Sequence, residues 1–276
     1  MQNDSRPSIL YLTDLSFEAK GREYYKEDLF LSTQLRDKFQ ILLCHPCDSW
    51  KFELSVDLIV WRNTGPVLFY KEYFEEFLKR VKKNNIPTYN SMTGKADIKG
   101  KQYLADLTRQ GYPVIPTVDE NGDWRDLPGS ASYMLKKIDG ADSIGARTVT
   151  RDELTSCERL GYLVQPFVEI QYEVSFYFVN KEFHYALFAP DPKRRWHLEE
   201  YKASSEDLNF ALQFIKWNAI EHGIQRVDAC RLRSGELLLV EIEDLNPYLS
   251  LDRIKPDLLK QFVNSFISAL NGVIAN

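Results

Sequence analysis

Three short apolar runs constrain the fold of this chain most strongly, because they lack polar alternation and are separated by helix-like stretches. They cover residues 9–12, 39–43 and 56–61. Strands that are buried on both faces of a parallel sheet have this pattern. A helical apolar stripe over 69–83 leads into a fourth short run at 86–89. The first part of the chain, to residue 93, is therefore predicted to be a small doubly wound α/β domain.

The remainder, residues 94–276, is predicted to form a second and larger α+β unit that begins after a polar connector. Two capping boxes, Thr150 with Glu153 and Ser204 with Asp207, each open a helix. The other expected elements are a helix over 101–109, strands at 113–117 and 133–136, three antiparallel strands within 162–188, a hairpin over 226–242 and a helix over 256–273.

Composition narrows the classes of function. The net charge of −5 and the pI near 5.5 argue against nucleic acid as a partner, because such binding needs a basic face. No apolar run approaches the length of a membrane span, and the start of the chain lacks the apolar segment of a signal peptide. We therefore expect a soluble, cytoplasmic protein, whose 4 cysteines are reduced thiols.

An acidic hairpin near the end of the chain is the sharpest chemical feature. Glu241 and Glu243 are two residues apart on one predicted strand, so they face the same side, and the hairpin can bring Asp228 beside them. Such a cluster of carboxylates is mutually repulsive unless a cation neutralises it. Oxygen ligands suit Mg²⁺, so the hairpin predicts a magnesium site, with solvated edge acids as the alternative.

Two lysines are candidates for contacts with phosphate. Lys101 begins a predicted helix, and Lys136 ends an apolar strand just before a loop that contains Gly140 and Gly145. Glycine lets backbone amides approach an anion closely. The loop matches neither the Walker pattern nor the dinucleotide fingerprint, and solvent-facing lysines are the alternative interpretation.

A break between strands is the candidate site for a nucleoside. The segment Gln165, Pro166, Phe167 and Val168 interrupts two strands, and Glu173 follows at the start of the second. Such a linker can offer backbone donors and acceptors to an adenine edge, and a nearby acid can accept the ribose hydroxyl protons. An ordinary connecting loop is the alternative.

The order of these features resembles that of the ATP-grasp superfamily, over roughly residues 95–255. Within it, the chain is similar to glutathione synthetase, D-alanine:D-alanine ligase and small ligases of amino-acid and natural-product metabolism. The resemblance implies an ATP-grasp fold with a lid over about 130–188, preceded by the small α/β domain. It also implies a carboxylate–amine ligase that uses ATP with Mg²⁺ or Mn²⁺ and passes through an acyl phosphate. A homodimer is a further expectation from the resemblance.

The resemblance assigns roles to individual residues. Lys101 and Lys136 would contact the ATP phosphates, Glu173 the ribose, and Arg226 the acyl-phosphate transition state. The adenine would lie against Gln165, Phe167 and Val168. The metal ligands would be Asp228, Glu241, Glu243 and Asn246. Three features depart from the usual pattern: Lys137 stands where proline is common, the phosphate loop has fewer glycines than most, and Glu243 stands where asparagine is frequent.

Arginines are candidates for binding the substrate acid, because a guanidinium can hold a carboxylate by two parallel hydrogen bonds. Arg62 follows a predicted strand of the first domain, and Arg194 and Arg195 lie on a loop. The acid and amine that are joined are expected to be small molecules.

Two other functions stay open from the sequence. Cys44 and Cys47 form a CxxC motif after a strand, as in thiol-redox proteins, although little helix follows it. A nucleotide-binding module without catalysis, acting as a regulator, is the second alternative.

Overall fold

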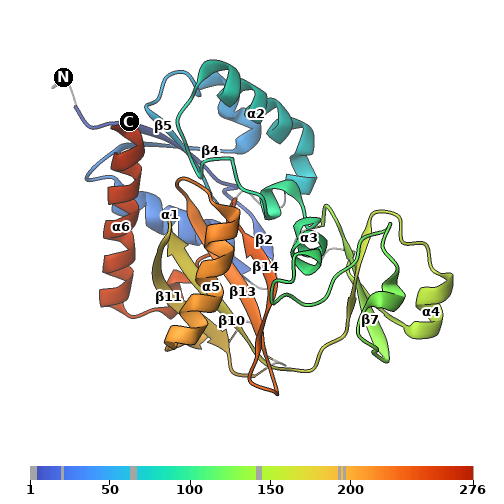
Figure 1. The fold of residues 1–276 in the computed structure, drawn as a ribbon. Helices are drawn as coiled ribbons and strands as arrows, with labels where there is room; N and C mark the ends of the chain where they lie inside the picture. The colour runs from blue at the N-terminus through green and yellow to red at the C-terminus, as the bar shows by residue number, and fades with distance from the viewer. Residues whose placement is uncertain are drawn as a thin grey trace.

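The structure is a computed structural model that describes residues 5–19, 22–62, 67–140, 145–191, 194 and 197–275. Figure 1 shows three parts of the molecule. A small α/β unit lies at the top, a large antiparallel sheet between helices lies below it, and a smaller sheet lies to one side. A short hairpin of β2 (Glu18–Ala19) and β3 (Arg22–Glu23) belongs to the first unit.

The first unit is built on a parallel sheet with the strand order β4-β1-β5-β6. Its strands are β1 (Ser8–Leu12), β4 (Gln40–Cys44), β5 (Leu58–Trp61) and β6 (Thr88–Tyr89). Alternate residues of β1 enter different cores: Ile9 packs with α1 (Tyr24–Leu35), whereas Leu10 packs with α2 (Lys71–Asn84). Both faces of the sheet are covered, which explains why its strands lack polar alternation. The predicted parallel sheet is confirmed.

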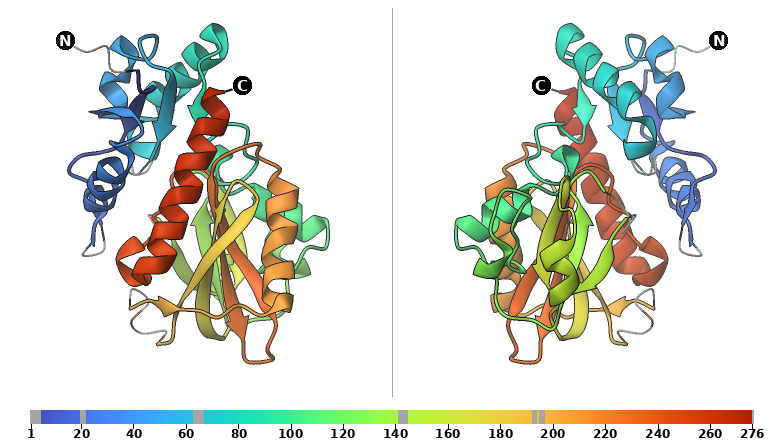
Figure 2. Two further views of the ribbon diagram at one scale, coloured as in Figure 1. Left: turned by 90° about the vertical axis from the view of Figure 1, so that its left-hand side faces the viewer. Right: turned by 90° about the vertical axis from the view of Figure 1, so that its right-hand side faces the viewer.

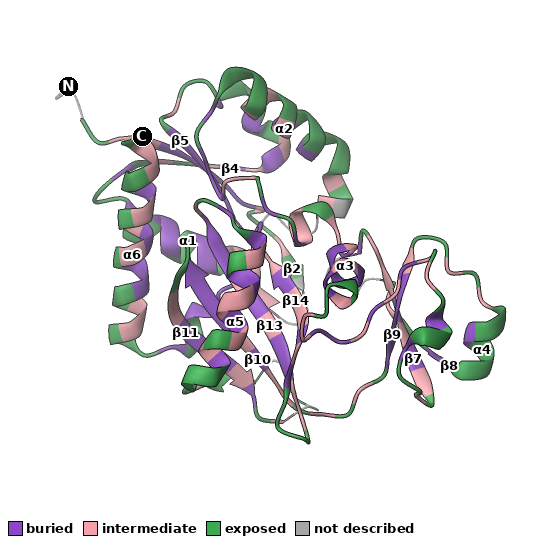
Figure 3. Ribbon diagram, viewed as in Figure 1, coloured by how far each residue is buried: buried purple, intermediate pink, exposed green. Residues whose placement is uncertain are grey.

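The second sheet is antiparallel and has the order β12-β11-β10-β13-β14. Its strands are β10 (Ile170–Val179), β11 (Glu182–Ala189), β12 (Glu199–Glu200), β13 (Ile224–Leu232) and β14 (Leu237–Glu243). Two helices, α5 (Ser205–Asn218) and α6 (Pro256–Ile274), pack on its opposite faces (Figure 2). Figure 3 shows that burial is concentrated in the strands between them.

The third sheet has three antiparallel strands in the order β8-β7-β9. Its strands are β7 (Ser132–Lys137), β8 (Arg147–Thr150) and β9 (Tyr162–Pro166). With α4 (Arg151–Ser156) it encloses a small core of its own. It lies at the right of Figure 1, beyond α3 (Tyr103–Arg109). The 3-10 helices span Pro46–Lys51, Val67–Tyr70, Asp97–Lys99, Trp124–Asp126 and Leu251–Arg253.

The last helix joins the first two sheets into one packed body. Phe262 and Phe266 of α6 belong to the same core as Tyr11 of the parallel sheet and Tyr185 of the antiparallel sheet. Asn90, directly after β6, adds polar contacts: its Nδ2 donates to the carbonyls of Ile224, Asp244 and Leu245, and its Oδ1 accepts the amide of Ile224 at 2.9 Å.

Both predicted capping boxes are confirmed, and each opens its helix through reciprocal bonds. The predicted strand at 113–117 is wrong. Val114 forms a single bridge to Leu239 instead, because Pro113 and Pro116 have no amide hydrogen to extend a ladder. Among the described residues, no helix is long and apolar enough to span a membrane.

Candidate active site

The β13–β14 hairpin brings three carboxylates together. Asp228 pairs directly with Glu241 across the strands, and Glu243 lies two residues further on the same face. Ligand oxygens of these three residues lie within 4.8 Å of one another, and all three side chains are half-buried. Alternation along a strand and pairing across the hairpin produce this arrangement, as the sequence predicted.

Two cations contact these acids. Arg226 lies opposite Glu243; its Nε and Nη2 donate to the two oxygens of Asp228, each at 2.8 Å, and Nη2 also contacts Glu243 at 2.5 Å. The ammonium of Lys101 lies 2.5 Å from Glu241. Charge-assisted contacts of this kind offset the repulsion between the carboxylates.

Burial and charge act on these acids in different proportions. The ammonium of Lys101 lowers the pKa of Glu241 to about 2, against the effect of burial. Burial raises the pKa of Glu243 well above its ordinary value, and the nearby Arg226 only partly offsets this. Glu241 is therefore held as an anion by its ion pair with Lys101, whereas burial favours the protonated form of Glu243.

Lys136 approaches the acids from the three-stranded sheet. Burial lowers the pKa of its ammonium, and the charges of Glu241 and Glu173 act in the opposite direction. Glu173 lies on β10, where it pairs with Cys230 of β13. Charged side chains from both antiparallel sheets thus face a common region.

The break between β9 and β10 is held by local hydrogen bonds. Gln165 is buried and donates to the hydroxyl of Thr117 at 2.8 Å. The amide of Phe167 donates to the carbonyl of Ser132 at 2.9 Å, while its ring is 53% exposed. Val168 follows and is half-buried. The segment connects the sheet that carries Lys136 to the sheet that carries the acids, and its predicted contacts with adenine stay a prediction.

Comparison with known proteins fits this architecture. No protein-family model matches the chain, and no curated protein matches its sequence. Solved structures do match. The D-cycloserine synthetase DcsG has a TM-score of 0.73 at 20% identity, covering 95% of this chain and 99% of that one. D-alanine–D-alanine ligase from Bacillus anthracis, complexed with ATP, has a TM-score of 0.65 at 12% identity, covering 98% and 99%.

A third match carries the name of the fold. The ATP-grasp ligase PsnB, complexed with a phosphomimetic variant of a minimal precursor, Mg and ADP, has a TM-score of 0.65 at 13% identity, covering 95% of this chain and 98% of that one. This chain has the ATP-grasp fold. The predicted ATP-grasp fold, preceded by a small α/β domain, is thereby confirmed. The three antiparallel strands predicted within 162–188 belong to two sheets, because β9 pairs with β7 whereas β10 pairs with β11 and β13.

Two other predicted site residues, Arg62 and Asn246, lie beside or within the loop that follows β14. Within the ATP-grasp fold, Arg62 is fully buried beneath the loop that follows β14, and its Nη2 donates to the carbonyl of Pro247 at 3.0 Å. Its predicted grip on a substrate carboxylate stays a prediction. Asn246 is half-buried, three residues after Glu243. Arg195 lies outside the described residues, and the neighbouring Arg194 is exposed and paired with Asp191 at 3.0 Å.

Sequence reasoning missed two acids beside this candidate site. Asp97 accepts from Lys101 at 3.1 Å, and its signal was its position four residues before that lysine. Asp244 is buried and accepts the amides of Ala96 and Ile98 at 3.0 and 2.9 Å, so it fixes the segment before Lys101 to the end of β14. Burial raises the pKa of Asp244 to about 6.

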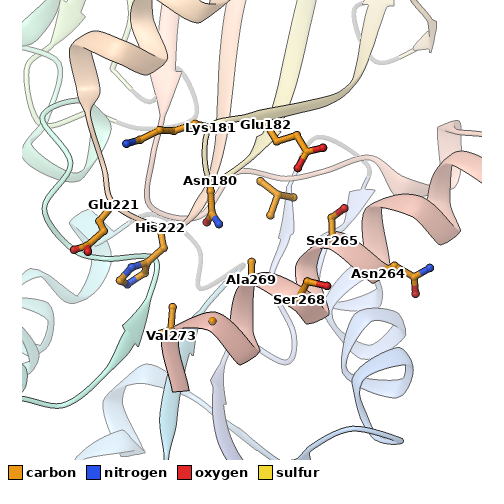
Figure 4. Close-up of a pocket in the computed structure, with 12 residues that line it drawn as sticks. Asn180, Lys181, Glu182, Glu221, His222, Asn264, Ser265, Ser268, Ala269 and Val273 are labelled. Carbon is orange, nitrogen blue, oxygen red and sulfur yellow. The ribbon is translucent and has the colours of Figure 1, made fainter. Parts of the chain in front are cut away.

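A separate groove of about 960 Å³ lies between α6 and the β10–β11 turn (Figure 4). It is lined by the β10–β11 turn, by Glu221 and His222, and by small or polar residues of α6 such as Ser268. None of the predicted site residues lines it.

Proposed function

We propose that the chain is a carboxylate–amine ligase that uses ATP and Mg²⁺ and forms an amide or peptide bond through an acyl phosphate. The observation that carries the proposal is the convergence of Asp228, Glu241 and Glu243 with Lys101 and Lys136 within an ATP-grasp fold. Its substrates would be amino acids or small natural-product acids and amines.

The residues present fit a magnesium ion. Asp228, Glu241 and Glu243 supply hard, anionic oxygen donors, which Mg²⁺ prefers together with substrate phosphates. Asn246, three residues after Glu243, is proposed as a further ligand. Mn²⁺ suits the same donors and is proposed as a substitute. When bound, the ion would neutralise charge on the phosphate oxygens.

The side chains of this site would bind, orient and stabilise the reacting groups. Phosphoryl transfer depends on positioning and charge compensation more than on a protein nucleophile. Lys101 and Lys136 would hold the phosphates of ATP, and Arg226 would stabilise charge on the transferred phosphoryl group. Glu173 is proposed for the ribose, and the segment with Gln165, Phe167 and Val168 for the adenine.

The proposed reaction has two steps. A carboxylate oxygen of the acid attacks the γ-phosphorus, the bond to the β-phosphate oxygen breaks, and ADP leaves. The nitrogen of the amine then attacks the acyl carbon, loses its proton to the solvent, and phosphate leaves with the oxygen that came from the acid. Because this reaction consumes ATP, we place it in the cytoplasm.

The boundaries of the units are part of the proposal. Residues 1–93 would form the preceding α/β domain and 94–276 the ATP-grasp domain. The proposed lid, at about 130–188, includes the three-stranded sheet and also β10 and β11, which the structure joins to the five-stranded sheet. A homodimer is proposed from the family resemblance alone.

The thiol-redox alternative gains no support from the structure. Burial raises the pKa of both Cys44 and Cys47, whereas a redox CxxC motif needs a thiolate with a lowered pKa. The amide of Cys47 donates to Nδ1 of His45, so the motif is closed into a short 3-10 turn.

The proposal is tested by release of ADP with Mg²⁺ and ATP, across amino acids and dipeptides supplied singly and in pairs. We expect ADP only when a suitable acid is present. With an acid labelled by ¹⁸O in its carboxylate, one labelled oxygen should appear in the released phosphate. Nucleotide binding without acid-dependent ADP release in any combination would favour the regulatory alternative, and unlabelled phosphate would contradict the acyl-phosphate route.

A further inference from the structure

We infer that Glu27 and Arg62 are positioning residues that hold the loop after the acidic hairpin, residues 246–251, in register with the metal-binding carboxylates. The inference rests on the proposed function. It concerns buried charged residues of the first unit that contact the backbone of this loop.

Glu27 and Arg62 bind the backbone of the loop directly. Glu27, on α1, accepts the amide of Leu249 at 2.8 Å through one oxygen and the amide of Leu251 at 3.2 Å through the other. Arg62, just after β5, donates to the carbonyl of Pro247 at 3.0 Å and lies 3.4 Å from Glu27. Three backbone groups of one short loop are therefore fixed by the first unit.

The other side of the same loop contacts the site. Arg226 donates through Nη1 to the carbonyl of Tyr248 at 2.8 Å, and the rest of its guanidinium holds Asp228 and Glu243. The position of Tyr248 thus helps to set the position of Arg226. A displacement of the loop would move the arginine and, with it, two of the three carboxylates.

Packing alone does not explain the buried pair of Glu27 and Arg62. Glu27 and Arg62 are almost fully buried, and a buried ion pair contributes less to stability than apolar residues of similar volume often do. The Nε atom of Arg62 lies 3.5 Å from the buried carboxylate of Asp28, and Nη1 is buried without a hydrogen-bond partner. A buried donor without a good acceptor lowers the stability of the folded protein. Stability alone therefore does not explain why Glu27 and Arg62 are buried here, whereas their contacts with the loop do.

The loop itself needs external support. Ser250 has a φ of +53°, a left-handed conformation that side chains other than glycine adopt at a cost. Arg22 donates to its hydroxyl at 2.9 Å, and Tyr185 donates to the carbonyl of Leu249 at 2.8 Å. The contacts of Glu27 lie on either side of this residue.

The variant Glu27→Gln tests the inference, because glutamine keeps one acceptor oxygen but turns an NH₂ donor toward the second backbone amide. Burial raises the pKa of Glu27 to about 7, so the comparison is made at a pH above that value, where Glu27 is ionised. There we expect hydrogen exchange of the 246–251 segment to accelerate about tenfold or more in the nucleotide-free protein, the effect of losing a hydrogen bond to a charged group. The Mg²⁺ concentration for half-maximal ADP formation should rise by a similar factor. Glu27→Asp, which is too short to reach both amides, should shift both in the same direction.

A matched control is Glu53→Gln, since Glu53 is a buried carboxylate of the same unit that is bound by Arg80 and Ser49, far from the loop in sequence. It should lower stability without changing exchange at 246–251 or the Mg²⁺ requirement. Equal exchange in the Glu27 and Glu53 variants, or an unchanged Mg²⁺ requirement, would overturn the inference. Hydrogen exchange is measured without nucleotide, so its result does not depend on the proposed function. A wild-type protein that releases no ADP would overturn the proposed function alone.

Discussion

Lys136 and Lys137 are adjacent on β7 but have different surroundings. Lys136 interacts electrostatically with Glu241 and Glu173, whereas the methylenes of Lys137 lie beside Gly145. Successive side chains of a strand point to opposite faces, so only the first of these lysines is directed toward the acids. The two residues form a natural pair for testing the phosphate contact.

We predict that Lys136→Met raises the KM for ATP by about 10- to 100-fold, the equivalent of one lost hydrogen bond to a charged group. Lys137→Met should change it by less than about twofold. Burial lowers the pKa of Lys136, so its ammonium loses its proton at a lower pH than an exposed lysine does. The KM of the wild type for ATP should therefore rise as the pH passes this lowered pKa. This rise should be absent in the Lys136 variant. Steady-state kinetics between neutral and alkaline pH measure both effects. Equal KM values for the two variants would contradict the assignment.

For individual residues, the sequence predicted which side chains belong to the candidate site better than it predicted the contacts that they make. The spacing of Glu241 and Glu243 and the turn at Gly235 were enough to place Asp228 beside them, because a hairpin follows local rules. The contacts of Arg62 with Glu27 and Pro247 depend on how distant elements pack, so the periodic pattern of the chain carries no signal for them.

The three-stranded sheet is the element most separate from the rest of the molecule. Most of its core, Trp124, Tyr133, Leu135, Val149 and Leu154, packs apart from the other large clusters, and Leu163 of β9 joins it to the core around α3 and α5. A bridge between Val118 and Val164 ties β9 to the preceding loop. An element with a small core of its own can move as a unit over a bound nucleotide.

We predict that Mg²⁺ with ADP slows hydrogen exchange in β7, β9 and the segment at 167–169, because the nucleotide would link the two antiparallel sheets. Exchange in α2, on the far side of the parallel sheet, should not change. Mass spectrometry of the protein with and without nucleotide measures both regions. Slower exchange spread evenly over the chain, or none in β7 and β9, would contradict the proposed lid.

The predicted strand at 113–117 shows where pattern reasoning fails at the element scale. Its apolar residues have strand propensity, but two prolines leave it with an isolated contact to β14. The starts of the two capped helices were predicted correctly, because each is fixed by residues three positions apart. Their C-terminal ends, expected near Gly161 and Glu221, come earlier, at Ser156 and Asn218.

The whole molecule depends on contacts between segments far apart in the chain. The last helix, α6, packs in the same core as the first sheet. The chain therefore passes from one sheet to another near residue 93, but the hydrophobic core continues across this division. Asn90 lies at this division and satisfies backbone groups of β13 and of the residues after β14. No sequence period could have indicated these contacts, because they join residues 134 to 155 positions apart.

We predict that Asn90→Ala lowers the free energy of unfolding by about 3 kcal/mol, because it leaves buried backbone groups without partners. Asn84→Ala is the matched control: Asn84 is exposed on α2 and makes one contact, with the carbonyl of Arg80, so its loss should cost less than about 0.5 kcal/mol. Urea unfolding measures both. Similar values for the two variants would show that Asn90 does not hold the units together.

The most direct test of the account is a calorimetric titration of Mg²⁺ with ADP into the wild-type protein and into Asp228→Asn, Glu241→Gln and Glu236→Gln. Glu236 lies on the same hairpin but is exposed at its turn, so it controls for the change of charge. We predict magnesium-dependent binding to the wild type and the Glu236 variant, and affinity at least about tenfold weaker in the other two. Absence of magnesium-dependent nucleotide binding in the wild type, or equal affinity in all four proteins, would contradict the account.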